Sequence, residues 1–405
     1  MSEAENSTLQ PDAGRTVVCH VSTVHPALDK RIFYRECVGL VEGGFEVHEV
    51  ACHDRDEVVQ GVHIHALPKP PNRLARLLWW PWLAYRKVLS LRPRPDIVHF
   101  HDPELMPVGQ ALRMRGMQAV FDVHENVAGT FESKHWLPVF VRWPLARAYE
   151  VAERFLTSGI AVVTVLDSMA QGYRHPRAVV RNLPRLGLGP APTPIDFKPP
   201  WRLVYTGYVT PERGGIRMLQ LLEDLRERGV PASLRIVGLI WPEWWQKQVF
   251  EYIEAHNLKD LVTVTGEVSQ VESLAEISKA HVGLCLLDAT PNYTNSLPVK
   301  MCEYMRYSLP VVASDFACWN EFVSDIHAGV QVDINNRKGI ADAVERMLSD
   351  PAEMARMGER GWQAVKEEYC WEKEQERLWR FYQQLLQRRG HVAECAEVAC
   401  SGSGR

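Results

Sequence analysis

Short runs of apolar residues alternate along this chain with longer segments in which apolar residues recur every three or four positions. The short runs are typical of buried strands, and the longer segments of amphipathic helices. Their alternation predicts parallel sheets covered by helices, which is a doubly wound α/β architecture. The predicted strands are residues 16–21, 47–51, 62–66, 97–100, 120–123, 160–165 and 178–181, and then 203–206, 234–237, 262–265, 281–287 and 311–313.

The helical segments complete two similar halves. Between residues 184 and 200 the composition shifts to Pro and Gly, which indicates a linker. The predicted helices are residues 28–44, 72–91, 136–155, 213–228, 245–256, 271–279, 339–348, 354–368 and 371–388. The predicted division is a tail over 1–14, a domain over 15–185, a linker over 186–200, a second domain over 201–370, a last helix over 371–390 and a tail over 391–405.

Composition narrows the class of protein. The 405 residues are 46% hydrophobic and 24% charged, so the chain is globular, and a net charge of −4 argues against general nucleic-acid binding. The first residues lack the apolar segment of a signal peptide, and no apolar run is long enough to span a membrane. Nine Cys without paired spacing indicate reduced thiols. We therefore expect a cytoplasmic protein.

The most informative stretch runs from residue 286 to residue 315. It reads as strand, polar loop, helix, loop and strand, with Ser296 as a helix cap and Pro298 in the first turn. The free N–H groups at the start of such a helix suit a phosphate. Glu303 lies deeper in the helix, where it could accept hydrogen bonds from ribose hydroxyls.

The segment from Asn295 to Met305, with its Glu303-Tyr304-Met305, resembles the donor-site signature of GT-B glycosyltransferases, in particular the retaining family 4. The resemblance implies two Rossmann-like domains facing across a cleft and a nucleotide-sugar donor. It places Glu303 at the ribose and Ser296 and Leu297 at the diphosphate. Asn295 stands where many relatives have a catalytic Glu, so the pattern differs there.

A glycine-rich loop at residues 206–215 follows a predicted strand and opens a helix. It resembles the family's Gly-Arg-x-x-x-x-Lys-Gly loop, with Arg213 in place of the Lys and Tyr208 in place of the Arg. Arg213 and Lys300 would neutralise the diphosphate without a metal, so no cofactor is expected. By the same resemblance, the diphosphate would contact Gly207 and Gly214, and the base would lie near Gly238, Glu267 and Val268.

Three segments of the first half carry further candidate residues. His25, Asp29 and Arg31 fit the His-Pro-x-x-Asp-x-Arg pattern of one branch of the family and would face the acceptor. His124, next to Glu125 after the strand 120–123, resembles the active-site His beside the transferred sugar. These resemblances imply a catalytic site formed by His124, Glu125 and Asn295.

His99 and His101 alternate on one predicted strand and therefore point to the same face. This spacing is compatible with a metal site, and an acceptor-side role for His101 and Asp102 or an ordinary strand-end position are the alternatives. Asp54 and Asp56 form an Asp-x-Asp tripeptide, which we interpret as a surface loop.

The helix from Asn72 to Leu91 combines Arg and Lys with several Trp and Leu residues. Such a helix can lie on an anionic membrane, and a packing helix with extended Arg side chains is the alternative. The prediction is thus a retaining glycosyltransferase that uses a nucleoside-diphosphate sugar and an unidentified acceptor, peripheral to the inner membrane face. A nucleotide-sugar 2-epimerase of the same fold and a non-catalytic sugar-binding relative remain as alternatives.

Overall fold

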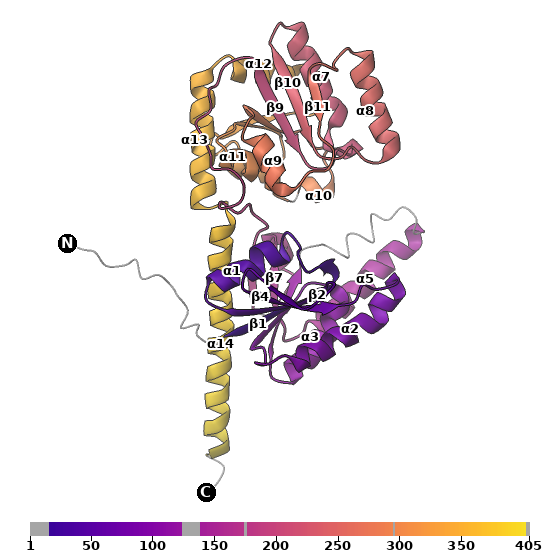
Figure 1. The fold of residues 1–405 in the computed structure, drawn as a ribbon, viewed down its shortest axis with the longest axis vertical. Coiled ribbons are helices and arrows are strands. Elements are labelled where there is room, and N and C mark those ends of the chain that lie inside the picture. Colours follow the sequence, from indigo (N-terminus) through magenta and orange to yellow (C-terminus); the bar gives the residue numbers. More distant parts are fainter. Residues whose placement is uncertain (1–15, 124–137, 174–175, 295, 402–405) are drawn as a thin grey trace, which may run out of the picture. The chain divides into compact units, whose positions relative to one another are not determined.

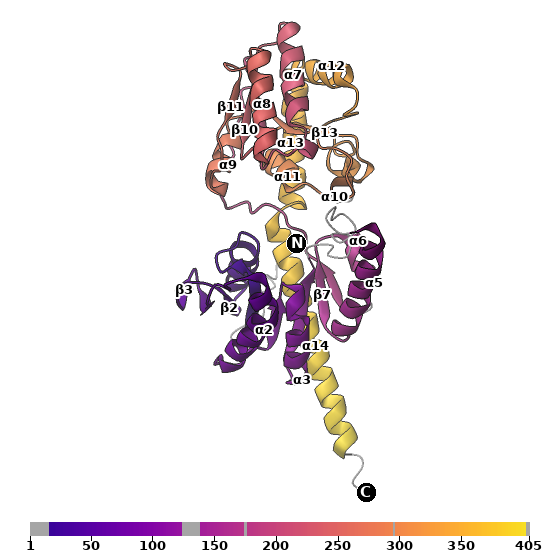
Figure 2. The ribbon, with the colours of Figure 1, turned by 90° about the vertical axis from the view of Figure 1, so that its right-hand side faces the viewer.

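The computed structural model describes residues 16–123, 138–173, 176–294 and 296–401. The chain forms two compact units. The first unit comprises Met1–Asn182 and Glu374–Arg405, and the second comprises Leu183–Lys373. Each contains a mainly parallel sheet with helices on both faces (Figures 1 and 2). This is the predicted α/β class with two Rossmann-like domains.

The sheet of the first unit has eight strands in the order β3-β4-β2-β1-β5-β6-β7-β8. All neighbours are parallel except the β3–β4 hairpin. Its central strands are mostly buried because helices cover both faces, and they include buried polar residues such as His20, His99 and Asp122. The strands are β1 Val17–Pro26, β2 Glu46–Cys52, β3 Glu57–Val59, β4 Val62–Leu67, β5 Ile97–Phe100, β6 Gln118–Val123, β7 Ala161–Thr164 and β8 Arg177–Val179.

Helices cover the two faces of this sheet unequally. One face carries η1, a π-helical turn at Ile32–Cys37, with α1 (Val38–Glu42) and α14 (Trp371–Ser401) (Figure 1). The other face carries α2, α3 and α5, with α3 in contact with both neighbours (Figure 2). The remaining helices of the unit are α2 Arg73–Ser90, η2 Pro103–Leu105, α3 Met106–Met114, α5 Val139–Leu156 and α6 Asp167–Ala170.

The sheet of the second unit has six parallel strands in the order β11-β10-β9-β12-β13-β14. The strands are β9 Trp201–Thr206, β10 Ala232–Val237, β11 Val262–Val264, β12 Val282–Cys285, β13 Val311–Ser314 and β14 Gly329–Val332. The helices are η3 Pro211–Arg213, α7 Gly215–Glu227, α8 Glu243–Ala255, α9 Gln270–Ile277, α10 Pro291–Thr294, α11 Val299–Arg306, η4 Ala317–Phe322, α12 Arg337–Leu348 and α13 Pro351–Glu367.

Several elements differ from the sequence-based prediction. The pattern missed β3, α3 and β14, because they are short or lack a strong apolar period. The last helix continues to Ser401, past the predicted start of a tail at residue 391. Ser296 does not cap α11: Pro298 is the cap residue, and no side chain caps the helix.

Candidate functional site

Two loops at the carboxyl edge of the second sheet approach each other closely. Gly207 follows β9 with φ 101°, and its N–H donates to the carbonyl of Val237 at 2.9 Å. Gly238 follows β10 with φ 148°, and a Cβ there would lie 2.3 Å from the Gly207 carbonyl oxygen. Only glycine fits these positions, and the backbone of Gly207 stays exposed to a ligand.

Two cations converge on that exposed glycine. A Cβ on Gly207 would lie 3.8 Å from Nη1 of Arg213 and 3.9 Å from Nζ of Lys300. The two residues come from different elements, since Arg213 ends η3 and Lys300 lies in the first turn of α11. An anion resting on the Gly207 backbone would therefore contact both side chains.

Lys300 is the more unusual of the two. The residue as a whole is half-buried, while Nζ itself is buried and has no hydrogen-bond partner among the described residues. Nζ sits 3.8 Å from the centre of the Tyr205 ring, a cation–π arrangement. Burial lowers the pKa of Lys300 to about 8. A buried ammonium without a partner is costly, and a bound anion would remove that cost.

Arg213 is held in place by tyrosine and backbone oxygens. Its Nε donates to the Tyr293 hydroxyl at 2.9 Å and its Nη1 to the Tyr208 carbonyl at 3.3 Å. Burial alone would lower the pKa of Arg213, but the hydrogen bond with Tyr293 and the other interactions with Tyr293 and Tyr205 together outweigh it and raise the pKa. The sequence analysis did not identify Tyr293, since a lone Tyr in a polar loop carries no recognisable pattern.

Helix α11 is fixed under the sheet by Tyr304. Its hydroxyl accepts from the N–H of Thr206 at 3.0 Å and donates to the Leu284 carbonyl at 3.3 Å, so it joins β9 and β12. The neighbouring Glu303 is half-buried and lies one turn after Lys300, whose charge it favours. The helix thus presents a cation and a carboxylate at successive turns.

The other predicted donor-site residues lie around this point. Gly214 has φ 72° and begins α7, and a Cβ there would lie 2.1 Å from the Leu286 carbonyl oxygen. The carbonyl of Ser296 accepts from Trp319 Nε1 at 2.7 Å. Leu297 and Val268 are half-buried, and Glu267 is exposed. Asn295 lies outside the described residues.

The predicted catalytic residues of the first unit, His124 and Glu125, also lie outside the described residues. The described strand β6 ends at Val123, immediately before them. Their expected roles stay predictions.

The Asp102 carboxylate binds the end of β1 in the first unit. Its Oδ2 accepts from the Ser22 hydroxyl at 2.9 Å and from the Thr23 N–H at 2.6 Å. His25 lies between two carboxylates, with Nδ1 3.7 Å from Asp29 and Nε2 3.9 Å from Asp102. These contacts hold the carboxyl end of β1, which runs to Pro26 and so past the predicted end of the strand at residue 21.

Asp29 caps the start of η1. Its Oδ1 accepts from the N–H groups of Arg31 at 2.7 Å and Ile32 at 3.0 Å. Burial alone would raise the pKa of Asp29, but hydrogen bonds from His25 and from these two N–H groups outweigh it and lower the pKa.

Arg31 and His101, predicted on the acceptor side, make contacts inside the first unit, and their acceptor-side role stays a prediction. Arg31 is buried and makes a two-pronged contact with Asp122, with Nε 3.2 Å and Nη2 3.1 Å from Oδ2. Its Nε is also 3.0 Å from Glu36. His101 is buried, with Nδ1 3.1 Å from the same Asp122 oxygen. Both side chains are therefore engaged inside the unit, in contacts between residues far apart in the chain that sequence spacing does not reveal.

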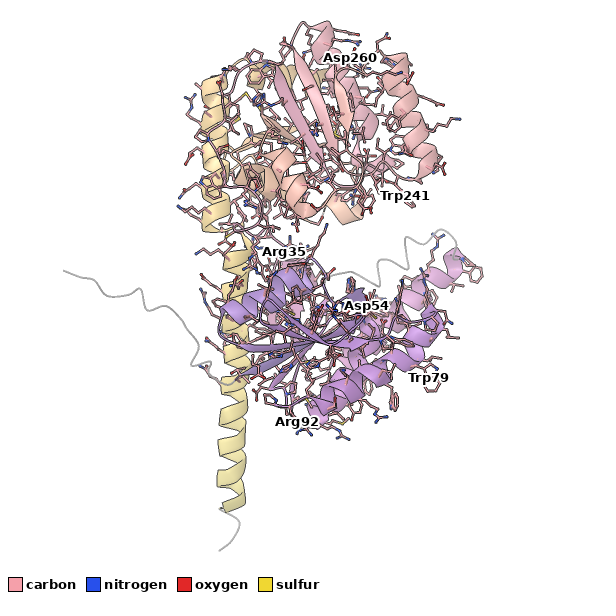
Figure 3. All side chains as sticks on the ribbon, viewed as in Figure 1. Arg35, Asp54, Trp79, Arg92, Trp241 and Asp260 are labelled. Carbon is pink, nitrogen blue, oxygen red and sulfur yellow. The ribbon has the colours of Figure 1, made fainter. Side chains whose placement is uncertain are left out.

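The Asp-x-Asp tripeptide lies in the exposed loop between β2 and β3, where Figure 3 labels Asp54. Asp56 pairs with Lys87 at 2.9 Å and accepts from the Ala66 N–H. This agrees with the interpretation of a surface loop.

Residues 195–363 match the family described as "Glycosyl transferases group 1", and residues 30–191 match the "Glycosyl transferase 4-like domain". Alpha-D-kanosaminyltransferase from Streptomyces kanamyceticus is 29% identical over 157 residues, which are 39% of this chain and 39% of the relative. Glycogen synthase from Mycobacterium tuberculosis is 22% identical over 349 residues, 78% of this chain and 79% of the relative.

Solved structures share the fold at low sequence identity. Sucrose-phosphate synthase from Thermosynechococcus elongatus aligns with a TM-score of 0.69 and 16% identity, covering 92% of this chain and all 100% of that one. Anabaena HepE in complex with UDP aligns with a TM-score of 0.66 and 11% identity, covering 91% and 100%. These similarities support the arrangement of two Rossmann-like units.

Proposed function

Because the chain belongs to the group 1 glycosyltransferases, whose fold is GT-B, we propose that it transfers a sugar from a nucleoside-diphosphate sugar to an acceptor hydroxyl with retention of anomeric configuration. The observation that carries the donor assignment is the buried, unpartnered ammonium of Lys300 beside Arg213. The diphosphate would rest on the Gly207 backbone between these two cations. HepE is described in complex with UDP and with UDP-glucose, which makes a uridine nucleotide the first to test.

The nucleotide would extend from this diphosphate position along the sheet edge. Glu303 would accept hydrogen bonds from the ribose, and the base would lie near Gly238, Glu267 and Val268. Arg213 and Lys300, with the N–H groups at the start of α11, would balance the diphosphate charge without a metal ion. The leaving phosphate oxygen would take the proton of the acceptor hydroxyl, so that no carboxylate nucleophile is required. His124, Glu125 and Asn295 would contact the transferred sugar.

The two alternatives make different demands on the chain. A 2-epimerase needs a carboxylate base in the first unit, and Asp102 is committed to the hydroxyl of Ser22 and the N–H of Thr23. An epimerase would also consume donor without any acceptor. A non-catalytic relative would bind the nucleotide and convert neither donor nor acceptor.

The acceptor side is proposed to lie on an anionic membrane at its inner face, through α2. The described residues include no helix with the length and apolarity needed to cross a bilayer. The outward face of α2 nevertheless carries Trp79 and Trp82, which are 64% and 50% exposed. Such a surface favours peripheral contact, as with a lipid-linked acceptor.

Calorimetric titration with UDP, GDP, TDP and ADP in the presence of EDTA tests the donor proposal. We expect one of the four to bind, with the same affinity after EDTA is replaced by Mg²⁺. Lys300→Met should weaken the chosen diphosphate about 10–100-fold, because a charge-assisted hydrogen bond contributes about 1.5–3 kcal/mol. The matching nucleoside, which lacks phosphate, should bind both proteins equally.

Lys247→Met is the matched control, since Lys247 is exposed on α8 and pairs only with Glu251 at 3.8 Å. An unchanged diphosphate affinity in Lys300→Met would remove Lys300 from the donor site. Loss of affinity in EDTA and its return with Mg²⁺ would show that a metal ion, and not the two protein cations, neutralises the diphosphate. Product analysis on the wild type, with and without acceptors, separates transfer from epimerisation.

A further inference from the structure

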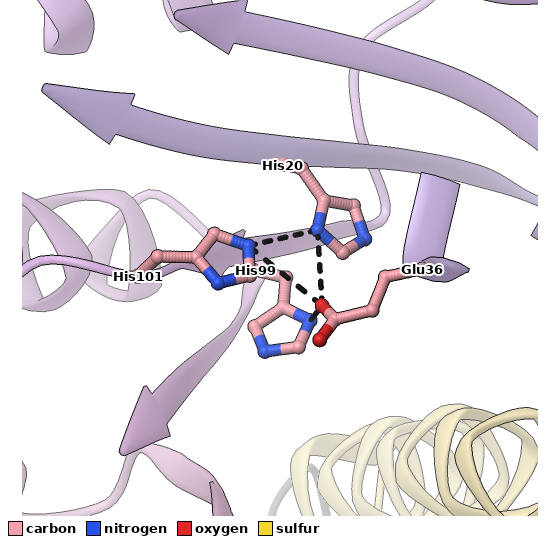
Figure 4. Close-up of side chains that lie close together, drawn as sticks. All are labelled: His20, Glu36, His99 and His101. Atoms are coloured by element: carbon pink, nitrogen blue, oxygen red, sulfur yellow. Dashed lines mark hydrogen bonds and ion pairs between the residues drawn. The ribbon is translucent and has the colours of Figure 1, made fainter. Parts of the chain in front are cut away.

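A second set of polar side chains lies inside the first unit, on the sheet face covered by η1 and α14. Parallel pairing of β1 with β5 places His20 beside His99. His101 follows β5 on the same face. Glu36 lies in η1, which covers this face, and its side chain extends toward the three histidines. The buried cluster consists of His20, Glu36, His99 and His101, all at most 2% exposed (Figure 4).

The three imidazoles converge on one carboxylate oxygen. Oε2 of Glu36 is 3.7 Å from His20 Nδ1, and the facing nitrogens of the other two imidazoles are 3.9 Å and 4.0 Å away. His20 Nδ1 and His101 Nε2 are 2.9 Å apart, and all four ligand atoms lie within 4.8 Å of one another. Ligands at 2.0–2.1 Å from a tetrahedral zinc ion are separated by about 3.3 Å, so these distances bracket that geometry.

Outer contacts already orient two of the ligands. The Asp122 carboxylate contacts Arg31 and lies 3.1 Å from His101 Nδ1, where it can accept a hydrogen bond from Nδ1–H, so that the Nε2 lone pair faces the cluster. The Nε of Arg31 holds Oε1 of Glu36 at 3.0 Å and leaves Oε2 facing the imidazoles. A carboxylate behind a ligating histidine is the usual outer shell of a metal site.

Charge balance points the same way. The Arg31 guanidinium contacts two buried carboxylates, those of Asp122 and Glu36. In the described part of the chain, Oε1 of Glu36 has only the ion pair with Arg31, and Oε2 has no hydrogen-bond partner. A buried carboxylate that is only partly compensated is costly, and a cation among the imidazoles would balance it.

We propose that the buried cluster binds one zinc ion with a structural role, separate from the donor site. Three imidazole nitrogens and one carboxylate oxygen complete a tetrahedral set, and the surroundings are closed to solvent, so no position is left for substrate. The ion would tie η1 to β1 and β5 beneath α14. The Tyr382 hydroxyl of α14 lies 2.6 Å from His99 Nδ1, and it gives up this contact when that nitrogen ligates the metal.

The test uses the full-length protein, purified without a polyhistidine tag and without metal columns. Elemental analysis of the protein as isolated should find about one zinc per chain after dialysis against metal-free buffer. Because the buried cluster is closed, the protein is then unfolded in chelator and refolded with one equivalent of Co²⁺. The visible absorption of tetrahedral cobalt is the expected result.

Glu36→Gln keeps the shape of the side chain, removes the anionic ligand and should abolish stoichiometric metal binding. The matched control is His65→Gln on β4. His65 Nε2 lies 2.9 Å from His48 Nδ1 in a stacked pair outside the buried cluster, so zinc binding should persist. Tyr382→Phe removes the competitor for His99 and should retain the metal.

If Glu36→Gln fails to fold, X-ray absorption of the zinc-loaded wild type identifies the zinc ligands without a variant. Imidazole and carboxylate ligands without sulfur support the proposal, and sulfur ligands contradict it. A wild type that refolds without taking up either zinc or tetrahedral cobalt overturns it. So does equal zinc retention by wild type and folded Glu36→Gln, which would indicate binding elsewhere on the chain.

Discussion

At the scale of single residues, the donor site is marked by a group that is unfavourable in the free protein. The ammonium of Lys300 is buried over the Tyr205 ring, has no hydrogen-bond partner in the part of the chain that the structure describes, and has its pKa lowered by burial to about 8. The charged form is therefore less stable in the folded chain than in the unfolded chain. A buried ammonium of this kind lowers the free energy of unfolding, and its presence indicates a site that binds an anion.

Lys300→Met is expected to stabilise the protein without ligand while it weakens donor binding. The pKa of Lys300 falls from 10.5 unfolded to about 8 folded, so the penalty is fully present below pH 8 and disappears as the pH rises through 10.5. At pH 7 the gain should be about 1–3 kcal/mol, reduced by the lost cation–π contact.

Denaturant titrations of both proteins between pH 7 and pH 10 measure this gain. Wild-type stability should rise toward that of Lys300→Met as the pH increases, and the difference should shrink. Lys247→Met should follow the wild type at every pH. A variant that is less stable than wild type at pH 7 would show that the Lys300 ammonium is already satisfied in the free protein.

At the scale of elements, α2 has two apolar faces. Its inner face packs Trp80, Ala84 and Val88 against the sheet. Its outer face exposes aromatic and aliphatic side chains, with the Arg86 guanidinium 4.9 Å from the Trp82 ring centre. The same face of the unit carries α5, where Phe140 and Trp143 are 80% and 63% exposed. Apolar side chains among arginines fit the interface of an anionic bilayer.

Replacement of both Trp79 and Trp82 by Gln is expected to weaken binding to vesicles rich in anionic lipid by more than about tenfold. Insertion of each indole buries apolar surface, and tenfold corresponds to only 1.4 kcal/mol. Sedimentation with anionic and neutral vesicles at low and high salt measures it. Figure 3 shows Trp79 on the outer side of α2 and Trp241 in the second unit.

The control for this experiment replaces Trp241 and Trp244, which are 61% and 57% exposed in the second unit. Their replacement should leave vesicle binding unchanged. A membrane role for α2 would be contradicted if both double variants lost vesicle binding equally. It would also be contradicted if the wild type bound anionic and neutral vesicles equally well.

At the scale of the whole molecule, the chain builds two cores and returns to the first with its last helix. From Glu374 onward, α14 belongs to the first unit. The buried Glu374 carboxylate pairs with the Arg181 guanidinium at 2.9 Å and accepts from the Arg181 N–H. Tyr382 reaches His99 under the sheet. The first unit is therefore completed by residues nearly two hundred positions away.

Two unfolding transitions are expected in calorimetry, one for each unit. Glu374→Gln leaves Arg181 without its buried carboxylate, and the first unit should lose about 3 kcal/mol, or roughly 5–10 °C in Tm. Saturating nucleotide should raise only the transition of the second unit.

Glu376→Gln serves as the comparison, because Glu376 is a surface partner of Arg380 on the same helix. Its transitions should match those of the wild type. A single transition that shifts as a whole with nucleotide and with Glu374→Gln would show that the two units unfold together.

Much of this protein is readable from local sequence. Periodicity alone indicates most strands and helices, because a buried strand and an amphipathic helix each impose their own spacing on apolar residues. Gly207, Arg213, Lys300 and Glu303 follow from motif resemblance, and within the second unit the structure brings Gly207, Arg213 and Lys300 together. Tyr293 was not predictable, since its role exists only through its contact with Arg213.

The sequence by itself determined the alternation of strands and helices, the two-unit division and the residue types at the donor loops. Which buried polar side chains contact one another depends on the tertiary structure. Strand order places β1 beside β5 and β5 beside β6, so His20 meets His99 from about eighty positions away and Arg31 meets Asp122. Local spacing carries no information about such neighbours, because they depend on the order in which strands join the sheet. Burial then shifts the pKa of such groups: it raises the pKa of Glu36 and lowers that of Lys300.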